Sequence, residues 1–274
     1  MTPAGEIAVG LAGFGNVGRD IASRLHASPI AGLRLTMVTA RDLEKAREAA
    51  RTIDPTLRVV TLAELAANCD VVVECATAES FPEIARTVLR AGRTLVAVSA
   101  GGVPNCGDME ALAREHGGRV RIASGALPGL DIVRSAAEGT IRSVRLISRI
   151  KPGSMAKEPF VRARGFDFAQ TPPAAPVRVF EGTAGEAARA FPRHFNVAIA
   201  LSLGGVGLER TQVEVWVDPD IPGAVHEVVV EADDVRLVMT SHNRPSANPR
   251  TSRIVAPSIM AALRAMVAPV IAGS

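Results

Sequence analysis

The sequence has few of the features that mark secreted, disulfide-rich or metal-binding proteins. Its three cysteines, Cys69, Cys75 and Cys106, include no CxxC pair, and no histidine cluster lies at metal-ligand spacing. Neither a disulfide framework nor a zinc site is therefore predicted, and no metal is expected. The first residues contain no basic segment followed by an apolar stretch, so we expect an intracellular, cytoplasmic protein.

Long apolar runs and concentrated charge are also missing. The most apolar stretch, residues 254–272, is interrupted by Pro257, Arg264 and Pro269. It therefore contains no uncharged span of the roughly 20 residues that a membrane helix needs. The formal net charge is only +3 at pH 7, and the arginines are scattered along the chain. We expect neither a membrane nor a nucleic-acid partner.

The chain does contain enough apolar material for a large core. Its 274 residues are 47% hydrophobic and 22% charged, as in ordinary globular proteins. Single cores stop growing at roughly 250 to 300 residues, so a chain of this length is expected to divide into two domains.

The most informative segment joins a short apolar run, residues 7–11, to three closely spaced glycines and a helix-like segment at residues 19–26. This order is typical of a dinucleotide pyrophosphate site. Gly13 permits the tight turn, Gly15 lets the backbone approach the phosphates, and Gly18 lets helix and strand pack closely. The predicted pyrophosphate-binding residues are Gly13, Phe14, Gly15, Asn16, Val17 and Gly18. In a chain with 24 glycines the pattern can also be a plain strand-to-helix turn.

Strands and helices alternate after this turn. Apolar or alternating runs predict further strands at residues 33–39, 58–61, 71–75, 94–98 and 120–122. Amphipathic segments predict helices at residues 43–52, 62–67, 81–91 and 109–116. The alternation predicts an α/β fold in which residues 1–125 form a Rossmann domain with a doubly wound parallel sheet.

Beyond about residue 130 the pattern changes to half-buried strands. Polar and apolar residues alternate at residues 143–150, 211–217, 225–231 and 235–240, as in a mainly antiparallel sheet with one exposed face. A proline-rich loop is predicted at residues 151–176, and helices at residues 183–190, 196–203 and 257–267. We therefore expect a second, α+β domain at residues 126–250 and a carboxyl-terminal segment, residues 251–274, whose helix can return to the Rossmann domain.

The end of the predicted second strand bears on the choice of cofactor. In this fold an Asp or Glu there binds the 2′-hydroxyl of the adenosine ribose, whereas an Arg accommodates a 2′-phosphate. The strand is followed by Ala40, Arg41 and Asp42, so Arg41 stands close to the reading position and the cofactor is predicted to be NADP or NAD. Alternatively, Arg41 is a solvated residue at the start of a helix.

Two later turns, residues 75–77 and 99–102, follow predicted parallel strands. Ligands of open α/β sheets bind outside the carboxyl ends of the strands. These turns are therefore expected to line the nicotinamide half of the cofactor, and Ala76 is the candidate cofactor-binding residue. Either turn can also be a simple connection to the next helix.

Several short motifs of the second half occur together in one order. They are Ser124-Gly125-Ala126-Leu127-Pro128-Gly129-Leu130-Asp131, Phe191-Pro192 with Asn196-Val197-Ala198, Asp218-Pro219, His226-Glu227, and Asn248-Pro249 with Thr251-Ser252. This combination resembles the L-aspartate dehydrogenase family over nearly the whole chain. The resemblance implies a Rossmann domain joined to an α+β domain that also carries the dimer contacts, and thus a homodimer. It also implies oxidation of L-aspartate to iminoaspartate with NAD or NADP, followed by hydrolysis to oxaloacetate and ammonia or by release of the imine to NAD biosynthesis.

The resemblance assigns roles to three residues. His226 matches the family's proposed catalytic histidine, and Ala126 and Asn196 match positions that contact the cofactor. A histidine suits the reaction because its ordinary pKa, about 6.5, allows it to accept and return protons near neutral pH. His194 and His242 are the other candidates of the second domain, and His226 is alternatively a partly exposed strand residue.

A dicarboxylic amino acid as substrate requires cations and hydrogen-bond donors. Lys151 follows the first strand of the second domain, and Asn248, Thr251 and Ser252 precede the last helix, whose first amides attract anions. These four residues are the predicted substrate contacts. The alternatives are an ordinary helix cap for the three residues before the helix and a solvated loop residue for the lysine.

Three positions depart from the family pattern. The family usually has an asparagine two residues before the catalytic histidine, where this chain has Ala224. Its Lys-Pro-Pro is Lys151-Pro152-Gly153 here, and its glycine-rich turn after the histidine strand is Ala232-Asp233-Asp234. A lost amide beside the histidine can change the ring's orientation or the substrate that it admits. Two rivals remain: an imine or aldehyde reductase of the homoserine dehydrogenase and dihydrodipicolinate reductase group, and a nucleotide-binding protein without catalysis.

Overall fold

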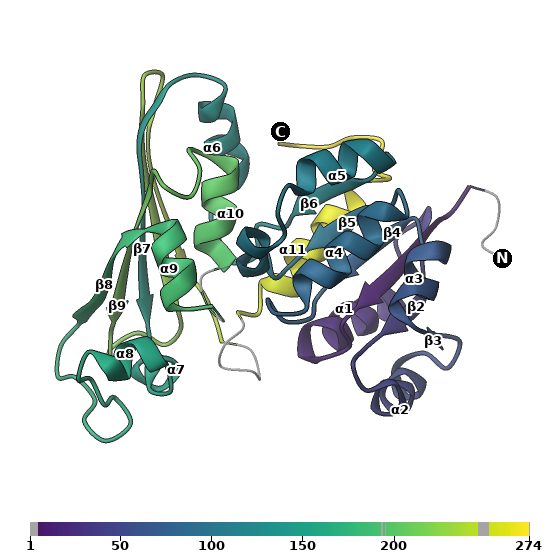
Figure 1. The fold of residues 1–274 in the computed structure, drawn as a ribbon, viewed down its shortest axis with the longest axis horizontal. Coiled ribbons are helices and arrows are strands. Elements are labelled where there is room, and N and C mark those ends of the chain that lie inside the picture. Colours follow the sequence, from purple (N-terminus) through teal and green to yellow (C-terminus); the bar gives the residue numbers. More distant parts are fainter. Residues whose placement is uncertain (1–4, 193, 195, 246–251, 274) are drawn as a thin grey trace. The chain divides into compact units, whose positions relative to one another are not determined.

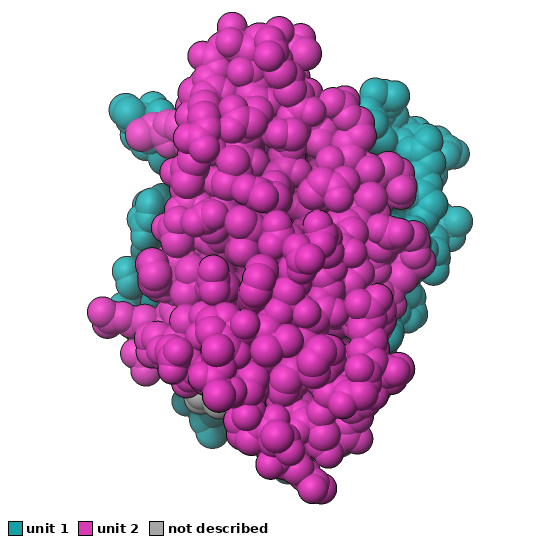
Figure 2. Space-filling view, turned by 90° about the vertical axis from the view of Figure 1, so that its left-hand side faces the viewer, with its two compact units in different colours: residues 1–123, 256–271 teal, residues 124–255, 272–274 magenta. Residues whose placement is uncertain are grey.

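The structure is a computed structural model that describes residues 5–192, 194, 196–245 and 252–273 (Figure 1). The chain forms two compact units, shown in separate colours in Figure 2. The first contains residues 1–123 with 256–271, and the second contains residues 124–255 with 272–274. Each unit is built on its own sheet.

The sheet of the first unit has six parallel strands in the order β3-β2-β1-β4-β5-β6. The strands are β1 (Ile7–Ala12), β2 (Leu33–Thr39), β3 (Arg58–Val59), β4 (Val71–Glu74), β5 (Thr94–Ala97) and β6 (Arg119–Ile122). The chain starts in the middle of the sheet, builds one half, and returns to the middle to build the other. This is the strand order of Rossmann domains, so the predicted fold class is confirmed here.

Helices cover both faces of the parallel sheet. They are α1 (Asn16–Ala27), α2 (Leu43–Ile53), α3 (Leu62–Asn68), α4 (Phe81–Arg90), the 3-10 helix η1 (Ala100–Asn105), α5 (Met109–His116) and α11 (Val255–Arg264). Residues of α1, α2 and α11 share one hydrophobic cluster with the strands, and residues of α3 and α4 share another. In β4, Val71 and Val73 belong to the first cluster and Val72 to the second. Burial on both faces explains why this strand is apolar throughout.

Helix α11 packs on the first unit although it follows the second in the sequence. Ile259 and Leu263 are fully buried in the cluster that contains α1, and burying side chains of this size stabilises a fold by about 1.5 to 3 kcal/mol each. The most apolar stretch of the sequence thus forms a core helix. No helix in the described part of the chain is long and apolar enough to cross a membrane.

The sheet of the second unit has five strands in the order β11-β10-β7-β9-β8. They are β7 (Ile141–Ile150), β8 (Val177–Thr183), β9 (Thr211–Val217), β10 (Val225–Ala232) and β11 (Arg236–His242). The β7–β9 pair is parallel, and the β7–β10, β10–β11 and β8–β9 pairs are antiparallel. The prediction of a second α+β domain with a mainly antiparallel sheet is confirmed.

Three helices lie over one face of this mixed sheet (Figure 1): α6 (Leu130–Ala137), α9 (Ala184–Ala190) and α10 (Asn196–Gly204). In β7, Val144 and Leu146 are fully buried, whereas Arg145 and Ile147 on the opposite face are more exposed. A strand with one covered face alternates in this way. The helices of this unit therefore leave the other face of the sheet uncovered.

The sequence prediction is wrong in part of the second unit. Strand β8 lies where no strand is predicted, and the short helices α7 (Pro152–Met155) and α8 (Pro159–Ala163) lie in the segment predicted as a loop. Helix α6 is also unpredicted. Strand β8 is at the sheet edge, and its register shifts between Arg178 and Phe180. An edge strand with an irregular register after several prolines gives little alternation to detect.

Candidate active site

Two of the three motif glycines are required by packing within the chain. Gly13, between β1 and α1, has φ +109°, a left-handed backbone that favours glycine. A Cβ on Gly13 would lie 2.6 Å from the carbonyl oxygen of Cys75, and a Cβ on Gly18 would lie 2.2 Å from the oxygen of Gly13. A side chain at either position would displace the backbone where β1, α1 and the turn after β4 meet.

Gly15 differs because no protein atom opposes a side chain there. Its φ of −81° suits any residue, and a Cβ would meet no protein atom within 4 Å. It is the N-cap of α1, whose first turn contains no acidic residue. The first amides of a helix bind phosphate oxygens, and a phosphate lying against the backbone explains a glycine at this position. The turn therefore fits the pyrophosphate of a dinucleotide.

The side chains of the other predicted residues of the turn either pack in the hydrophobic core or are exposed to solvent. Phe14 is 7% exposed and belongs to the cluster that contains α1, and Val17 packs against that cluster. Asn16 is exposed, and its Oδ1 accepts a hydrogen bond from Arg19 over 3.4 Å. The side chains of Phe14 and Val17 thus pack in the core, which leaves their backbone amides as the candidate cofactor contacts.

The end of β2 presents an arginine rather than an available carboxylate. The Gly13 amide donates to the Thr39 oxygen over 2.9 Å, which joins this strand end to the glycine turn. Arg41 is exposed just beyond the strand. The carboxylate of Asp42 accepts a hydrogen bond from the Lys45 amide over 3.0 Å as the N-cap of α2. Arg41 therefore remains the candidate for contact with a substituent of the ribose.

A buried carboxylate lies beside Ala76, where the nicotinamide half is expected. Glu74 ends β4 and is 0% exposed. Its Oε1 accepts from the Ala76 amide over 2.8 Å, and its Oε2 accepts from the amides of Ser99 over 2.9 Å and Val98 over 3.2 Å. Burial raises the pKa of this carboxyl, whereas the amide donors favour its charged form. Glu74 was not predicted from the sequence, although a single acidic residue after three apolar valines is a signal that could have identified it.

The predicted catalytic histidine is buried in the second unit. His226 is the second residue of β10 and 6% exposed, and its Nδ1 lies 3.0 Å from the Oγ of Ser148 on β7. Ser148 is fully buried as well. Burial lowers the pKa of His226 to about 4, below the ordinary value of about 6.5 expected from the sequence, so the ring is neutral at pH 7 but a weaker base than expected. A neutral imidazole held at one nitrogen can accept a proton at the other.

Ser148, His226 and Ser241 form a polar row across three strands. His226 lies directly opposite Ser148 on β7 and Ser241 on β11, so the three side chains share one face of the sheet. The Oγ of Ser241 donates to the backbone oxygen of Ala126 over 3.0 Å and lies 3.0 Å from the Nδ2 of Asn243, which donates to it. The row thus joins Ala126, a predicted cofactor contact, to the strand beside the histidine.

The two serines of the polar row were missed by the sequence analysis. In β7, Ser148 continues the alternation of the buried Val144 and Leu146, so it is a polar residue at a core position. In β11, Ser241 likewise continues the less exposed face that includes Met239. A hydroxyl at a core position of an alternating strand is the available signal.

The predicted substrate residues lie near the same end of the sheet, where the structure describes them. Lys151 is exposed and directly follows β7 as the N-cap of α7. Ser252 forms a β-bridge with Pro245, beyond the end of β11. Asn248 and Thr251 lie outside the described residues.

Asn196 and the two alternative histidines have different surroundings. Asn196 is exposed at the first position of α10. The Nε2 of His194 lies 2.9 Å from the Oε1 of Glu158, in a pair whose side chains are 8% and 7% exposed. His242 is exposed at the end of β11. Of the three histidines, His226 is therefore the one that belongs to the polar row.

Comparisons with known proteins decide the family. A family model described as "Aspartate dehydrogenase, C-terminal" matches residues 131–266, and one described as "Homoserine dehydrogenase, NAD binding domain" matches residues 13–123. The L-aspartate dehydrogenase 3 of Bordetella bronchiseptica is 39% identical over 274 residues, which is 100% of both chains. The chain belongs to the L-aspartate dehydrogenase family. The identification from the sequence motifs is confirmed.

Another relative is an L-aspartate dehydrogenase, and two solved structures share the fold. The L-aspartate dehydrogenase of Bradyrhizobium diazoefficiens is 39% identical over 264 residues, 96% of this chain and 93% of that protein. The solved aspartate dehydrogenase of Thermotoga maritima has a TM-score of 0.75 at 22% identity, covering 98% of this chain and 100% of that one. The homoserine dehydrogenase of Thiobacillus denitrificans has a TM-score of 0.62 at 17% identity, covering 96% and 74%. Both structures share the fold.

Membership of the L-aspartate dehydrogenase family bears on two further predictions. The match of residues 13–123 to an NAD-binding model confirms a nicotinamide dinucleotide cofactor, NAD or NADP. The full-length similarity to dehydrogenases identifies an NAD(P)-dependent oxidoreductase and disfavours a nucleotide-binding protein without catalysis. No group of three His, Cys, Asp or Glu side chains that could hold a metal ion occurs among the residues that the structure describes.

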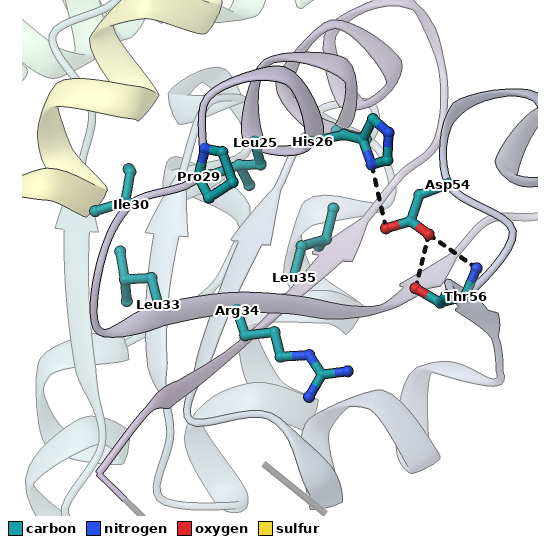
Figure 3. Close-up of a pocket in the computed structure, with 10 residues that line it drawn as sticks. Leu25, His26, Pro29, Ile30, Leu33, Arg34, Leu35, Asp54 and Thr56 are labelled. Atoms are coloured by element: carbon teal, nitrogen blue, oxygen red, sulfur yellow. Dashed lines mark hydrogen bonds and ion pairs between the residues drawn. The ribbon is translucent and has the colours of Figure 1, made fainter. Parts of the chain in front are cut away.

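A small cavity lies beside the start of β2, at the opposite end of this strand from Arg41 (Figure 3). It measures about 170 Å³ and is lined by the end of α1 and the start of β2. At its rim the Nδ1 of His26 lies 3.5 Å from Asp54, and hydrogen bonds from Thr56 lower the pKa of the Asp54 carboxyl. These polar groups satisfy one another. Because parallel sheets bind ligands at the carboxyl ends of their strands, this cavity is not the cofactor site.

Proposed function

We propose that this chain catalyses the NAD(P)-dependent oxidative deamination of L-aspartate, or of a close analogue, and the reverse reductive amination. The forward reaction passes through iminoaspartate, which water converts to oxaloacetate and ammonia. The observation that carries the proposal is the 39% identity over the full length with an L-aspartate dehydrogenase. The neutral His226 supplies the acid–base group that such a reaction needs.

The first unit binds the cofactor, which when bound accepts a hydride from Cα of the substrate. The first amides of α1, at Asn16, Val17 and Gly18, bind the pyrophosphate. Gly13 shapes the turn before the helix, and its own amide donates to Thr39. Arg41 meets the ribose substituent, and Ala76 lines the nicotinamide side. Ala126 and Asn196 are the cofactor contacts that we propose for the second unit.

His226 moves protons at the substrate nitrogen. The ammonium group of L-aspartate must lose a proton before the hydride leaves Cα, because the nitrogen lone pair then forms the imine bond. When Nδ1–H of His226 donates to the Oγ of Ser148, the lone pair of Nε2 is available to take that proton. Nε2 passes that proton to solvent, which accounts for the net proton that the reaction releases. The neutral ring then accepts a proton from the water that attacks the imine and returns it to the departing ammonia. Ser148 is a positioning residue that selects this tautomer.

Cations and hydrogen-bond donors hold the two substrate carboxylates. We assign this role to Lys151, Asn248, Thr251 and Ser252. The assignment is supported by Lys151, which directly follows β7, and by Ser252, which bridges Pro245 beyond the end of β11.

A neighbouring side chain can replace the asparagine that this chain lacks at Ala224. The backbone amide of Asn243 donates to the backbone oxygen of Ala224 over 2.8 Å. The side-chain amide of Asn243 donates to the Oγ of Ser241 in the polar row. A side-chain amide is therefore present beside Ala224, although it comes from the end of β11 rather than from the approach to β10. We infer that Asn243 supplies the donor that family members carry two residues before the histidine.

The homodimer predicted from the resemblance would form through the uncovered face of the mixed sheet. That face carries Trp216, whose ring lies 5.6 Å from the guanidinium carbon of Arg149 and 5.8 Å from that of Arg178. It also carries Val238, which is 51% exposed. Aromatic, arginine and apolar side chains are typical of subunit interfaces. Light scattering on the purified chain tests the dimer, and the cytoplasmic location stays a prediction.

The experiment that tests the function follows the absorbance of NADH or NADPH while the purified protein is given oxaloacetate and ammonia. We expect cofactor oxidation that requires both compounds, and cofactor reduction with L-aspartate in the other direction. Turnover with oxaloacetate in the absence of ammonia would identify a hydroxy-acid dehydrogenase. Turnover with aldehydes or cyclic imines alone would identify the rival reductase. Cofactor binding without any turnover would leave a nucleotide-binding protein.

A further inference from the structure

Three turns meet at the carboxyl end of the parallel sheet, and hydrogen bonds connect them. The Sγ of Cys75 donates to the oxygen of Gly13 over 3.0 Å, which joins the turn after β4 to the glycine turn. The Oγ of Ser99 donates to the oxygen of Ala76 over 3.2 Å, which joins the turns after β5 and β4. Glu74 binds amides of both of these later turns. One side chain therefore determines how the two turns are spaced.

The buried carboxylate of Glu74 is unfavourable for stability, so its presence in the sheet core calls for another role. It is fully buried, and in the described part of the chain no lysine or arginine forms an ion pair with it. An unpaired buried carboxylate destabilises a fold, and a valine or leucine at this position would avoid that cost. An apolar side chain could not accept hydrogen bonds from Ala76, Val98 and Ser99. The fixed position of these turns is what the carboxylate contributes.

We propose that Glu74 is a positioning residue that holds residues 75–77 and 98–99 in the arrangement that accepts the nicotinamide half of NAD(P). The inference rests on the proposed placement of the nicotinamide half at these turns. Strands β4 and β5 are neighbours, with Glu74 opposite Ala97, so the end of β4 is the place from which one side chain reaches both turns. The glycine turn is held by the close packing of Gly13 and Gly18 and does not bind the Glu74 carboxylate. The two halves of the cofactor should therefore respond differently to a change at Glu74.

Glu74→Gln tests this difference. Glutamine has nearly the same size, but its NH2 group must face either the Ala76 amide or the amides of Val98 and Ser99, so one turn loses its acceptor. We expect NADH or NADPH to bind about tenfold more weakly, as for a lost hydrogen bond to a charged group. ADP-ribose, or 2′-phospho-ADP-ribose, lacks the nicotinamide and should keep its affinity within about twofold, because close packing holds the glycine turn without a bond to the Glu74 carboxylate. Titration calorimetry measures both affinities.

Asp70→Asn is the matched control, because Asp70 stands at the other end of the same strand. Its Oδ2 accepts from the Ala8 amide over 2.9 Å, and its Oδ1 accepts from Arg93 over 3.2 Å. This carboxylate also holds a backbone amide, but at the amino end of β4, away from the cofactor. We expect Asp70→Asn to lower the unfolding temperature and to leave the affinities for NADH and ADP-ribose in their original ratio.

The ratio of the two affinities decides the proposal. An equal loss for NADH and ADP-ribose in Glu74→Gln, or no loss for either, would overturn it. If that variant does not fold, Ser99→Ala removes the hydroxyl that bonds to Ala76 and to Glu74, while the carboxylate keeps its three backbone amide donors. A selective loss of NADH binding in Ser99→Ala would support the proposal, and an unchanged ratio would overturn it. Wild-type protein that binds NADH but does not deaminate aspartate would refute the proposed function and leave this inference standing.

Discussion

The two sheet ends that carry the candidate residues are built in opposite ways. At the carboxyl end of the parallel sheet, the candidate cofactor residues belong to backbone turns that Gly13, Gly18 and Glu74 hold in place. At the end of the mixed sheet, the candidate catalytic groups are side chains from separate strands, with Ser148 and His226 in direct contact. The parallel-sheet end requires residues without bulky side chains, whereas the mixed-sheet end requires particular functional groups.

This difference decides what the sequence reveals. A backbone site depends on consecutive residues, so it leaves a local spacing of glycines that identifies it. Ser148 and His226 are 78 residues apart and meet only because β7 pairs with β10. No spacing marks such a pair, and His226 was found through the family resemblance instead. Local motifs thus predict the cofactor half, whereas the catalytic half requires the tertiary structure or a relative.

Replacing His226 should have the largest effect on function. We expect His226→Ala to lower kcat by about a hundredfold to ten-thousandfold, the usual contribution of general acid–base catalysis. Binding of NADH or NADPH should change little, because the glycine turn belongs to the other unit. His242→Ala, which removes an exposed histidine of the adjacent strand, is the control and should retain full turnover. Steady-state kinetics with L-aspartate measure both variants, and unchanged turnover in His226→Ala would remove the assigned role.

Two glycine variants should separate packing from ligand binding in the glycine turn. Gly18→Ala places a Cβ 2.2 Å from the Gly13 oxygen and should lower the free energy of unfolding by about 1 to 3 kcal/mol, the usual cost of overpacking. Gly15→Ala meets no protein atom within 4 Å, so it should keep wild-type stability and lose affinity for NADH or NADPH. Thermal unfolding and titration calorimetry check the two variants. Equal destabilisation by both would contradict the assignment of Gly15 to the phosphates.

The contrast between local patterns and long-range contacts also explains which parts of the fold could be predicted. Strand β4 was recognised because it is buried on both faces and its valines form a continuous apolar run. Strand β8 was missed because it has one neighbour and an irregular register at Phe180, so the pairing with β9 rather than its own pattern makes it a strand. Glu74 and Ser148 were missed for a related reason. Each is a polar residue inside an apolar pattern, and its partners come from distant parts of the chain.

Burial of His226 should make stability depend on pH. Its pKa is about 4 in the folded chain, against 6.5 as the ordinary value of an unfolded chain, so the unfolded chain binds the proton first as the pH falls. Stability is therefore retained above about pH 6.5, declines between about pH 6.5 and 4, and loses nothing more from this group below that range. Between pH 7 and pH 5 the contribution should fall by about 2 kcal/mol.

A variant without the imidazole isolates this contribution. His226→Gln removes the titrating group and keeps an amide that can bond to Ser148. The other titrating groups are common to both proteins, so they cancel when the free energies of unfolding are subtracted. Denaturant unfolding at pH 7 and pH 5 should show that the difference between wild type and variant changes by about 2 kcal/mol. A difference that is independent of pH would show that the histidine is not buried in its neutral form.

The smallest effect is expected at the ribose, the one place where the first unit would use a side chain for recognition. Arg41 is exposed, and an exposed contact with a 2′-phosphate is worth about 1 kcal/mol, so Arg41→Ala should weaken NADPH binding about fivefold. NADH has no phosphate there and should bind as before. Arg51→Ala is the control for net charge. Arg51 is also exposed, but it lies in the last turn of α2, at the other end of that helix from Arg41. An unchanged ratio of NADPH to NADH affinity in Arg41→Ala would mean that Arg41 only faces solvent and that the adenosine end does not read the 2′-phosphate through it.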